Sequence, residues 1–155
     1  DGMVSASKDI LKIFGKDKYV QGYFEYDSKK SGGVTVSNLR ISDNIINAPY
    51  YVTNPKLVVV TKDEYFTKFN MLDNIKDNGI LLINTIKNEQ EINELISGRD
   101  KEIINNRNIK VYYINATKIA YECNIKGKIN KIMEMVILNL FGLANSKDIL
   151  ESGIR

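Results

Sequence analysis

The chain has 155 residues, 43% of them hydrophobic and 26% charged, which fits one soluble globular domain. Its 22 basic and 19 acidic residues give a net charge of +3, too balanced for a protein that binds nucleic acid through phosphate contacts. It contains no histidine and a single cysteine, Cys123. This excludes histidine-dependent catalysis, an internal disulfide and an iron–sulfur cluster held by four cysteines of this chain. Cys123 is predicted to pack as a small apolar residue.

The N-terminal segment predicts a helix whose first turn can bind an anion. Gly2 is followed by small residues and then by the amphipathic stretch 9–14. Backbone N–H groups in the first turn of a helix lack internal partners and lie at the positive end of the helix dipole. Helix capping alone would explain the pattern equally well. Because such a helix normally follows a strand, we also expect this chain to be cut from a longer polypeptide.

Two strand-like runs, at 19–26 and 34–41, predict an antiparallel hairpin. They alternate polar and apolar residues and flank the segment SKKSGG at 28–33. This segment, here called the lysine turn, combines two ammonium groups, two hydroxyls and two glycines. Such groups can hold a phosphorylated or other anionic ligand. Lysines in a turn are more often simply solvated, and the residue order is not that of a P-loop.

From residue 57 onward, strand-like and helix-like segments alternate. Short apolar runs predict buried strands at 57–60, 80–83 and 109–114, and helical spacing predicts helices at 63–72, 88–96, 101–107, 115–121, 131–143 and 146–152. Strands separated by helices of this length indicate right-handed βαβ units. The predicted fold class is therefore α/β: one domain over 1–155 with a mainly parallel Rossmann-like sheet, flanking helices in a three-layer αβα arrangement, and the N-terminal hairpin.

Several reactive or aromatic side chains are better explained by structure than by catalysis. Asp63 and Glu64 are predicted to be charges at a helix N-terminus rather than a catalytic pair. Asn115 follows a strand, where α/β proteins often bind ligands, but it is also a good helix cap, and we favour the cap. Three aromatic side chains are predicted to lie in the core rather than to form a cofactor platform: Tyr65, Phe66 and Phe69. No catalytic residue and no metal site is predicted in this chain.

Three stretches resemble the gamma-type domain of the 2-oxoacid:ferredoxin oxidoreductases, most of all that of the pyruvate:ferredoxin or pyruvate:flavodoxin oxidoreductases. YFEYDSKKSGGVTVSNLR, residues 23–40, is similar to the family's YDSKKSGGVTVSHLR, with Asn38 where the family often has His. DGMVSASK resembles the family's GSDGTVGANK, with Ser5 and Ser7 in place of Gly and Asn. INATKIA, residues 114–120, resembles INAVKIA. The three blocks occur in the family's order and are spread over most of the chain.

The resemblance implies that the chain works inside a larger enzyme. Members of the family cleave pyruvate on thiamine diphosphate, transfer the acetyl group to coenzyme A, and pass electrons through iron–sulfur clusters to ferredoxin or flavodoxin. Thiamine diphosphate, magnesium and the clusters would belong to other domains or subunits, so the isolated chain would be inactive. The resemblance further implies a cytoplasmic homodimeric enzyme of anaerobic metabolism, whose partners are its own remaining domains and the electron acceptor, with no nucleic acid and no membrane.

For this chain, the resemblance implies a contribution to coenzyme A binding. The phosphates and the pantetheine arm would meet the first turn of the N-terminal helix and the lysine turn. The expected contact residues are Gly2, Met3, Val4, Ser5, Ser28, Lys29, Lys30 and Ser31. Lysines supply point charges and backbone amides supply directional donors. Because Ser5 adds a side chain where the family has Gly, the expectation rests mainly on the lysine pair.

Three alternatives stay open. The substrate could be another 2-oxoacid, such as 2-oxoglutarate, a branched-chain 2-oxoacid or indolepyruvate. The chain could be an inter-domain docking module that binds no ligand, because a lysine turn can equally meet an acidic protein surface. A nucleotide-binding dehydrogenase is disfavoured, because the chain contains no complete GxGxxG motif.

Overall fold

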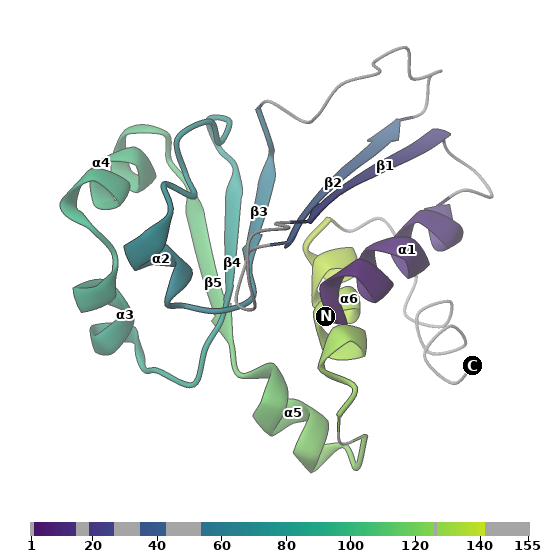
Figure 1. Cartoon of the computed structure of the whole chain (residues 1–155). Helices are drawn as coiled ribbons and strands as arrows, with labels where there is room; N and C mark the ends of the chain where they lie inside the picture. The colour runs from purple at the N-terminus through teal and green to yellow at the C-terminus, as the bar shows by residue number, and fades with distance from the viewer. Residues whose placement is uncertain (1, 15–18, 27–34, 43–53, 126, 142–155) are drawn as a thin grey trace. The chain divides into compact units, whose positions relative to one another are not determined.

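The structure is a computed structural model that describes residues 2–14, 19–26, 35–42, 54–125 and 127–141 (Figure 1). The chain divides into two compact units. One consists of residues 53–118 and is here called the central unit, and the other combines residues 1–52 with 119–155 and is called the terminal unit. Among the described residues, no helix reaches the length and apolarity needed to cross a bilayer. The predicted helix at 146–152 lies outside the described residues.

The central unit contains a parallel three-stranded sheet. Its strands are β3 (Leu57–Val60), β4 (Ile80–Asn84) and β5 (Lys110–Ile114), and they lie in the order β3-β4-β5. All three predicted strands are present to within about one residue at each end, as expected for boundaries. Because the strands are parallel, their carboxyl ends meet at one edge of the sheet. The open parallel sheet with flanking helices confirms the α/β fold class.

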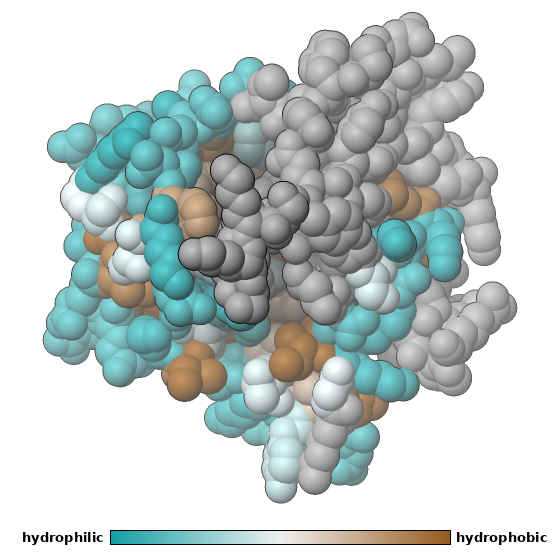
Figure 2. Space-filling model, in the orientation of Figure 1, coloured by the Kyte–Doolittle hydropathy of each residue, from teal (hydrophilic) through white to brown (hydrophobic). Residues whose placement is uncertain are grey.

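Helices α2 (Tyr65–Lys68), α3 (Glu89–Leu95) and α4 (Gly98–Asn106) accompany this sheet, on one side of it in Figure 1. Side chains two positions apart on a strand, such as Leu81 and Ile83 of β4, point to the same face of the sheet. They form one core with residues from the helices and loops: Val60, Phe66, Leu72, Ile75, Leu81, Ile83, Ile92, Ile96 and Ile109. On the face visible in Figure 2, the surface over α3 and α4 is mostly hydrophilic.

α2 is shorter than the predicted helix at 63–72. The backbone of Phe69 is extended, with φ −137° and ψ 148°, so the helix ends after one turn. Phe66 is buried as predicted, at 5% exposure. Phe69 is 43% exposed, with its ring edge-on to Tyr65 at a centroid distance of 5.9 Å, so its predicted core position is wrong. The apolar spacing fits a longer helix, but without helical backbone Phe69 does not share the buried face of Phe66.

Local caps set the start of the next two helices. The Asn88 side chain accepts a hydrogen bond from the Glu91 N–H, and the Glu91 carboxylate accepts one from the Asn88 N–H, a reciprocal capping box. Ser97 Oγ accepts a hydrogen bond from the Asp100 N–H at 3.1 Å. Because Ser97 caps α4, this helix begins at Gly98, three residues before the predicted start.

The terminal unit contains the antiparallel hairpin and two long helices. Its elements are α1 (Gly2–Phe14), β1 (Tyr19–Tyr26), β2 (Thr35–Ser42) and α6 (Ile129–Phe141). The hairpin prediction is confirmed, with Tyr19 opposite Ser42 and Tyr26 opposite Thr35. α1 packs against α6 and against both strands of the hairpin. Its buried residues include Ala6 and Ile10, and those of α6 include Ile132, Met133, Ile137 and Leu138.

Cys123 is exposed, so the prediction that it packs as a small apolar residue is wrong. It directly follows α5 (Ala116–Glu122), and its neighbour Asn124 has the left-handed φ of 56°. A backbone that turns into this conformation ends a helix, and the residues at such an end commonly face solvent. The prediction relied on the apolar character of cysteine, which does not indicate that the chain reverses direction at Asn124.

Candidate functional site

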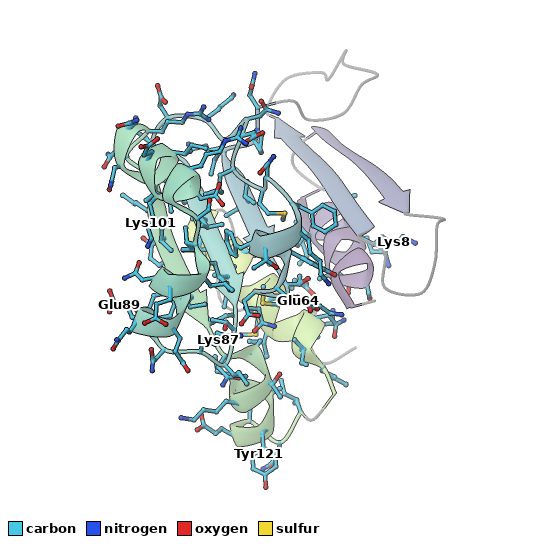
Figure 3. All side chains as sticks on the ribbon, turned by 60° about the vertical axis from the view of Figure 1, so that its left-hand side comes forward. Lys8, Glu64, Lys87, Glu89, Lys101 and Tyr121 are labelled. Carbon is cyan, nitrogen blue, oxygen red and sulfur yellow. The ribbon has the colours of Figure 1, made fainter. Side chains whose placement is uncertain are left out.

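A network of polar side chains joins two loops at the carboxyl edge of the parallel sheet. Asp63 follows β3, and Thr85 and Lys87 follow β4. The Thr85 hydroxyl donates a hydrogen bond to Asp63 Oδ2 at 2.6 Å, and Lys87 Nζ donates one to the same oxygen at 2.7 Å. Thr85 Oγ1 in turn accepts a hydrogen bond from the Lys87 N–H at 3.0 Å. The three side chains therefore satisfy one another (Lys87 is labelled in Figure 3).

The Asp63 carboxylate is held in its charged form by these contacts. Burial alone would raise its pKa, but the hydrogen bonds from Lys87 and Thr85 outweigh this and lower the pKa below its ordinary value. The Glu64 side chain makes an exposed ion pair with Lys68 at 3.7 Å. Asp63 and Glu64 therefore have separate partners. Asp63 is more than a charge at a helix N-terminus, because its hydrogen bonds connect the loop after β3 with the loop after β4.

The asparagine side chains at this edge have structural partners as well. Asn84 Nδ2 donates to the Thr61 carbonyl at 3.3 Å, and Asn84 Oδ1 accepts a hydrogen bond from the Ala116 N–H at 3.0 Å. Asn115 Oδ1 accepts a hydrogen bond from the Lys118 N–H at 2.9 Å, so the prediction that Asn115 caps a helix is confirmed. At this edge, where α/β proteins usually bind ligands, Asp63, Asn84 and Asn115 thus have hydrogen-bond partners within the protein.

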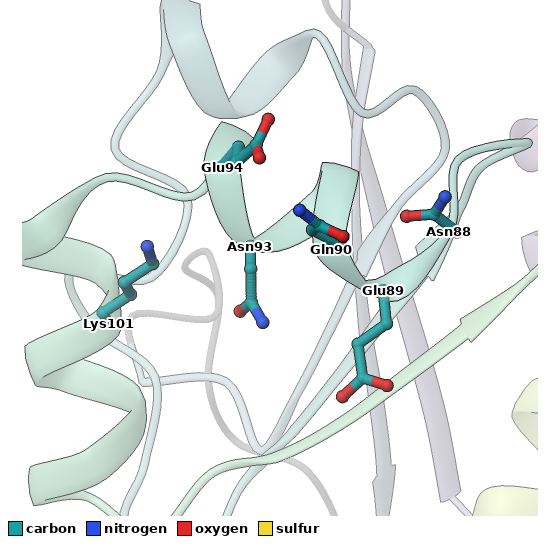
Figure 4. Close-up of a pocket in the computed structure, with 6 residues that line it drawn as sticks. All are labelled: Asn88, Glu89, Gln90, Asn93, Glu94 and Lys101. Carbon is teal, nitrogen blue, oxygen red and sulfur yellow. The ribbon is translucent and has the colours of Figure 1, made fainter.

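A shallow hollow of about 530 Å³ lies beside α3 and α4 (Figure 4). Tyr113 of β5 hydrogen-bonds to Glu89, one of the residues that line the hollow, and burial together with the Glu89 charge raises the pKa of the tyrosine. The lining is Asn88, Glu89, Gln90, Asn93, Glu94 and Lys101. With two carboxylates and one ammonium group, this hollow does not favour a polyanion such as a phosphate ester.

The expected coenzyme A contacts fall into two groups. α1 begins at Gly2, so the first turn of this helix contains the four residues from Gly2 to Ser5, as predicted, and Ser5 is exposed. The other four expected contact residues, Ser28, Lys29, Lys30 and Ser31 of the lysine turn, lie outside the described residues. The strands on either side of that turn are described, and both pack against α1. Whether the two groups converge on one ligand stays a prediction.

A charge cluster that the sequence reasoning missed joins α1 to α6. Lys131 Nζ donates a hydrogen bond to Asp9 Oδ2 at 2.6 Å and another to Glu134 Oε2 at 3.0 Å. Glu134 is 1% exposed, and its Oε1 has no hydrogen-bond partner among the described residues. The spacing of Lys131 and Glu134 on one helix was a possible signal, but a carboxylate on α6 is ordinarily expected on the solvent face.

Burial and charge act in opposite directions within this cluster. Burial raises the pKa of Glu134, and the neighbouring Lys131 only partly offsets that effect. For Lys131, burial would lower the pKa, but the hydrogen bonds to Asp9 and Glu134 outweigh it and raise the pKa. The ammonium group is thus firmly protonated at neutral pH. Among the described residues, no group of three or more potential ligands can hold a metal ion.

The fold and these sites define a class: an α/β domain with an open parallel sheet, whose loops and helices are connected by partly buried ion pairs. A family model for pyruvate ferredoxin/flavodoxin oxidoreductase matches residues 1–155, and the chain belongs to this family. A probable pyruvate-flavodoxin oxidoreductase of Escherichia coli is 38% identical over 142 residues, which is 90% of this chain and 12% of that protein. A pyruvate:ferredoxin oxidoreductase of Moorella thermoacetica has the same identity and coverage.

A solved structure has the same overall fold. It is pyruvate oxidoreductase subunit PORC from Thermotoga maritima, with a TM-score of 0.72 and 25% identity, covering 96% of this chain and 74% of that subunit. The chain therefore spans 12% of the length of the two curated relatives described above and matches 74% of the PORC subunit. The relative named for flavodoxin and the relative named for ferredoxin are equally similar to this chain, at 38% identity.

Proposed function

We propose that this chain is the part of a pyruvate:ferredoxin or pyruvate:flavodoxin oxidoreductase that contributes to coenzyme A binding. The enzyme as a whole would decarboxylate pyruvate oxidatively and form acetyl-coenzyme A. Thiamine diphosphate, magnesium and iron–sulfur clusters would be held outside this chain. Family membership supports the reaction, and the names of the relatives support pyruvate as the substrate.

One observation carries the coenzyme A assignment. α1 starts at Gly2 and packs on both strands that flank the lysine turn, all within the terminal unit. Free N–H groups of a first helical turn and two ammonium groups are complementary to a phosphorylated carrier. In the central unit, by contrast, Asp63, Lys87 and Asn84 are engaged with protein partners.

Substitution of Lys29 and Lys30 by alanine in the complete enzyme tests this function. We expect the KM for coenzyme A to rise by about tenfold or more, because each lost charge-assisted contact to phosphate removes roughly 1.5–3 kcal/mol. The KM for pyruvate should stay unchanged. Lys101→Ala is the matched control, since Lys101 is an exposed lysine of the central unit.

An unchanged KM for coenzyme A in the double variant, measured at low ionic strength, would contradict the assignment. If assembly of the enzyme fails instead while coenzyme A binding by the remaining intact protein is normal, the lysine turn docks another domain. Comparing pyruvate with 2-oxoglutarate, branched-chain 2-oxoacids and indolepyruvate as substrates tests the choice of oxoacid.

A further inference from the structure

One ammonium group, that of Lys131, bonds to carboxylates of both α1 and α6. Lys131 bonds to Asp9 on α1 and to Glu134 on its own helix. Asp9 directly precedes the buried Ile10 in α1, and its side chain is partly exposed, at 25%. Because Glu134 is 1% exposed, its carboxylate needs a partner inside the protein.

Glu134 has no second donor among the described residues. Its Oε1 is buried and unpartnered, and its Oε2 bonds to Lys131 alone. Loss of Lys131 would therefore leave a buried carboxylate without any described hydrogen bond. It would also remove the ammonium group that bonds to both the Asp9 and the Glu134 carboxylates and so connects the two helices.

Lys12 provides a natural contrast on the same carboxylate. Its Nζ lies 3.8 Å from Asp9 Oδ1, and its side chain is 80% exposed. An ion pair that is this long and this solvated contributes little. The Lys131 side chain is 19% exposed, and its contact with Asp9 is shorter by more than 1 Å. The structural effect is thus expected from Lys131 and not from Lys12.

We propose that Lys131 is a positioning residue that holds α1 on α6 and thereby keeps the first turn of α1 in place for the phosphates of coenzyme A. This inference rests on the proposed function. Asp9 lies about 10 Å along the helix from Gly2, at 1.5 Å per residue, so a tilt at Asp9 displaces the first turn. α1 also packs on both strands of the hairpin, so the same tilt moves the strands that flank the lysine turn.

The test is Lys131→Met in the complete enzyme, which keeps the length of the side chain and removes its charge. We expect the KM for coenzyme A to rise by about tenfold to a hundredfold, because misplacement of a binding group by about 1 Å has effects of this size. The KM for pyruvate and kcat at saturating coenzyme A should change by less than about twofold, since binding rather than reaction is affected. Lys131→Arg should restore the KM, and Lys12→Met should leave it unchanged.

Asp9→Asn covers the case in which Lys131→Met does not fold. It keeps an acceptor for Lys131, leaves the pair with Glu134 intact, and should raise the KM for coenzyme A by about two- to threefold through a weaker, neutral hydrogen bond. Equal rises in the KM for pyruvate and coenzyme A would show a general loss of structure and overturn the proposal. So would a wild-type KM for coenzyme A in Asp9→Asn and in folded Lys131→Met.

The outcomes separate this inference from the proposed function. If Lys131→Met behaves as wild type while the double substitution of Lys29 and Lys30 raises the KM, the lysine turn binds coenzyme A and Lys131 does not position it. If neither variant changes the KM, the proposed function itself fails. Hydrogen exchange gives a readout besides activity, with faster exchange expected in α1 of Lys131→Met and unchanged exchange in β3, β4 and β5.

Discussion

Asp63 receives two hydrogen bonds on one oxygen, from Thr85 and from Lys87, and both donors come from the loop after the neighbouring strand. Its pKa in the folded state lies below the ordinary value of 3.8, despite the opposing effect of burial. The native protein therefore keeps Asp63 ionised at pH values where the unfolded chain binds a proton. The resulting stabilisation is fully present above about pH 3.8 and is lost as the pH falls through the lower folded-state pKa.

Lys87→Met should lower the free energy of unfolding at pH 7 by about 0.5–1 kcal/mol, a small value because Lys87 is partly exposed. The loss should shrink as the pH falls below the ordinary pKa of Asp63, because the protonated carboxyl no longer attracts an ammonium group. Urea denaturation of the chain at pH 7 and near pH 3 measures both values. Lys68→Met, which removes an exposed 3.7 Å pair, should have no measurable effect. An equal loss at both pH values would show that the charge of Asp63 is irrelevant.

At the scale of elements, Asn78 and Gly79 determine how the chain enters β4. Asn78 has a φ of 57°, a left-handed conformation that asparagine tolerates better than most residues. The Gly79 N–H donates to the Lys76 carbonyl at 3.0 Å. A Cβ on Gly79 would lie 2.8 Å from that carbonyl oxygen and 3.0 Å from the Lys56 carbonyl oxygen. Both neighbours are backbone atoms, so the strand could not accommodate the methyl group without moving.

Gly79→Ala should therefore reduce the free energy of unfolding by about 1–3 kcal/mol, the usual range for an overpacked position. Gly98→Ala is the matched control, because a Cβ there meets no atom within 4 Å and Gly98 is the first residue of α4. Alanine at that helical position should be neutral or stabilise by up to about 1 kcal/mol. Thermal denaturation of the two variants side by side measures the difference. Similar effects at both positions would mean that the close approach at Gly79 is relieved by local movement.

At the scale of the whole molecule, the two units differ in how far apart their contacts lie in the sequence. The polar contacts of Asp63 in the central unit join residues 22 and 24 positions apart. The Asp9–Lys131 contact of the terminal unit joins residues 122 positions apart. Closing a long loop costs more entropy than closing a short one, and long-range contacts form more slowly.

We therefore expect the central unit to acquire stable structure first during refolding. Pulse-labelling hydrogen exchange should show early protection of the amides of Leu81, Leu82 and Ile83 in β4, and later protection of Ile10 in α1. All four residues are buried, at 0%, 0%, 0% and 2% exposure, so solvent access in the native state does not explain a difference. Earlier protection of Ile10 than of β4 would contradict the expected order.

The sequence alone predicted the secondary structure of the parallel sheet and the hairpin. The strands of the parallel sheet are short, mainly apolar runs, and the strands of the hairpin alternate polar and apolar residues. Both patterns depend only on residues that are close in the sequence. Asn115 was predicted as a cap for the same reason, since its partner is the N–H three residues later. The resemblance of residues 23–40 pointed to the family, which the match over residues 1–155 confirms.

Only the tertiary structure determined the partners of Asp63 and Glu134 and the exposure of Phe69 and Cys123. Asp63 meets Lys87 because β3 and β4 are adjacent and parallel, and Glu134 is buried because α6 packs against α1. Both outcomes depend on which elements meet, and local patterns carry no information about that. Sequence periodicity fixes which residues can form a face, whereas the free energy gained by burying that face depends on what packs against it.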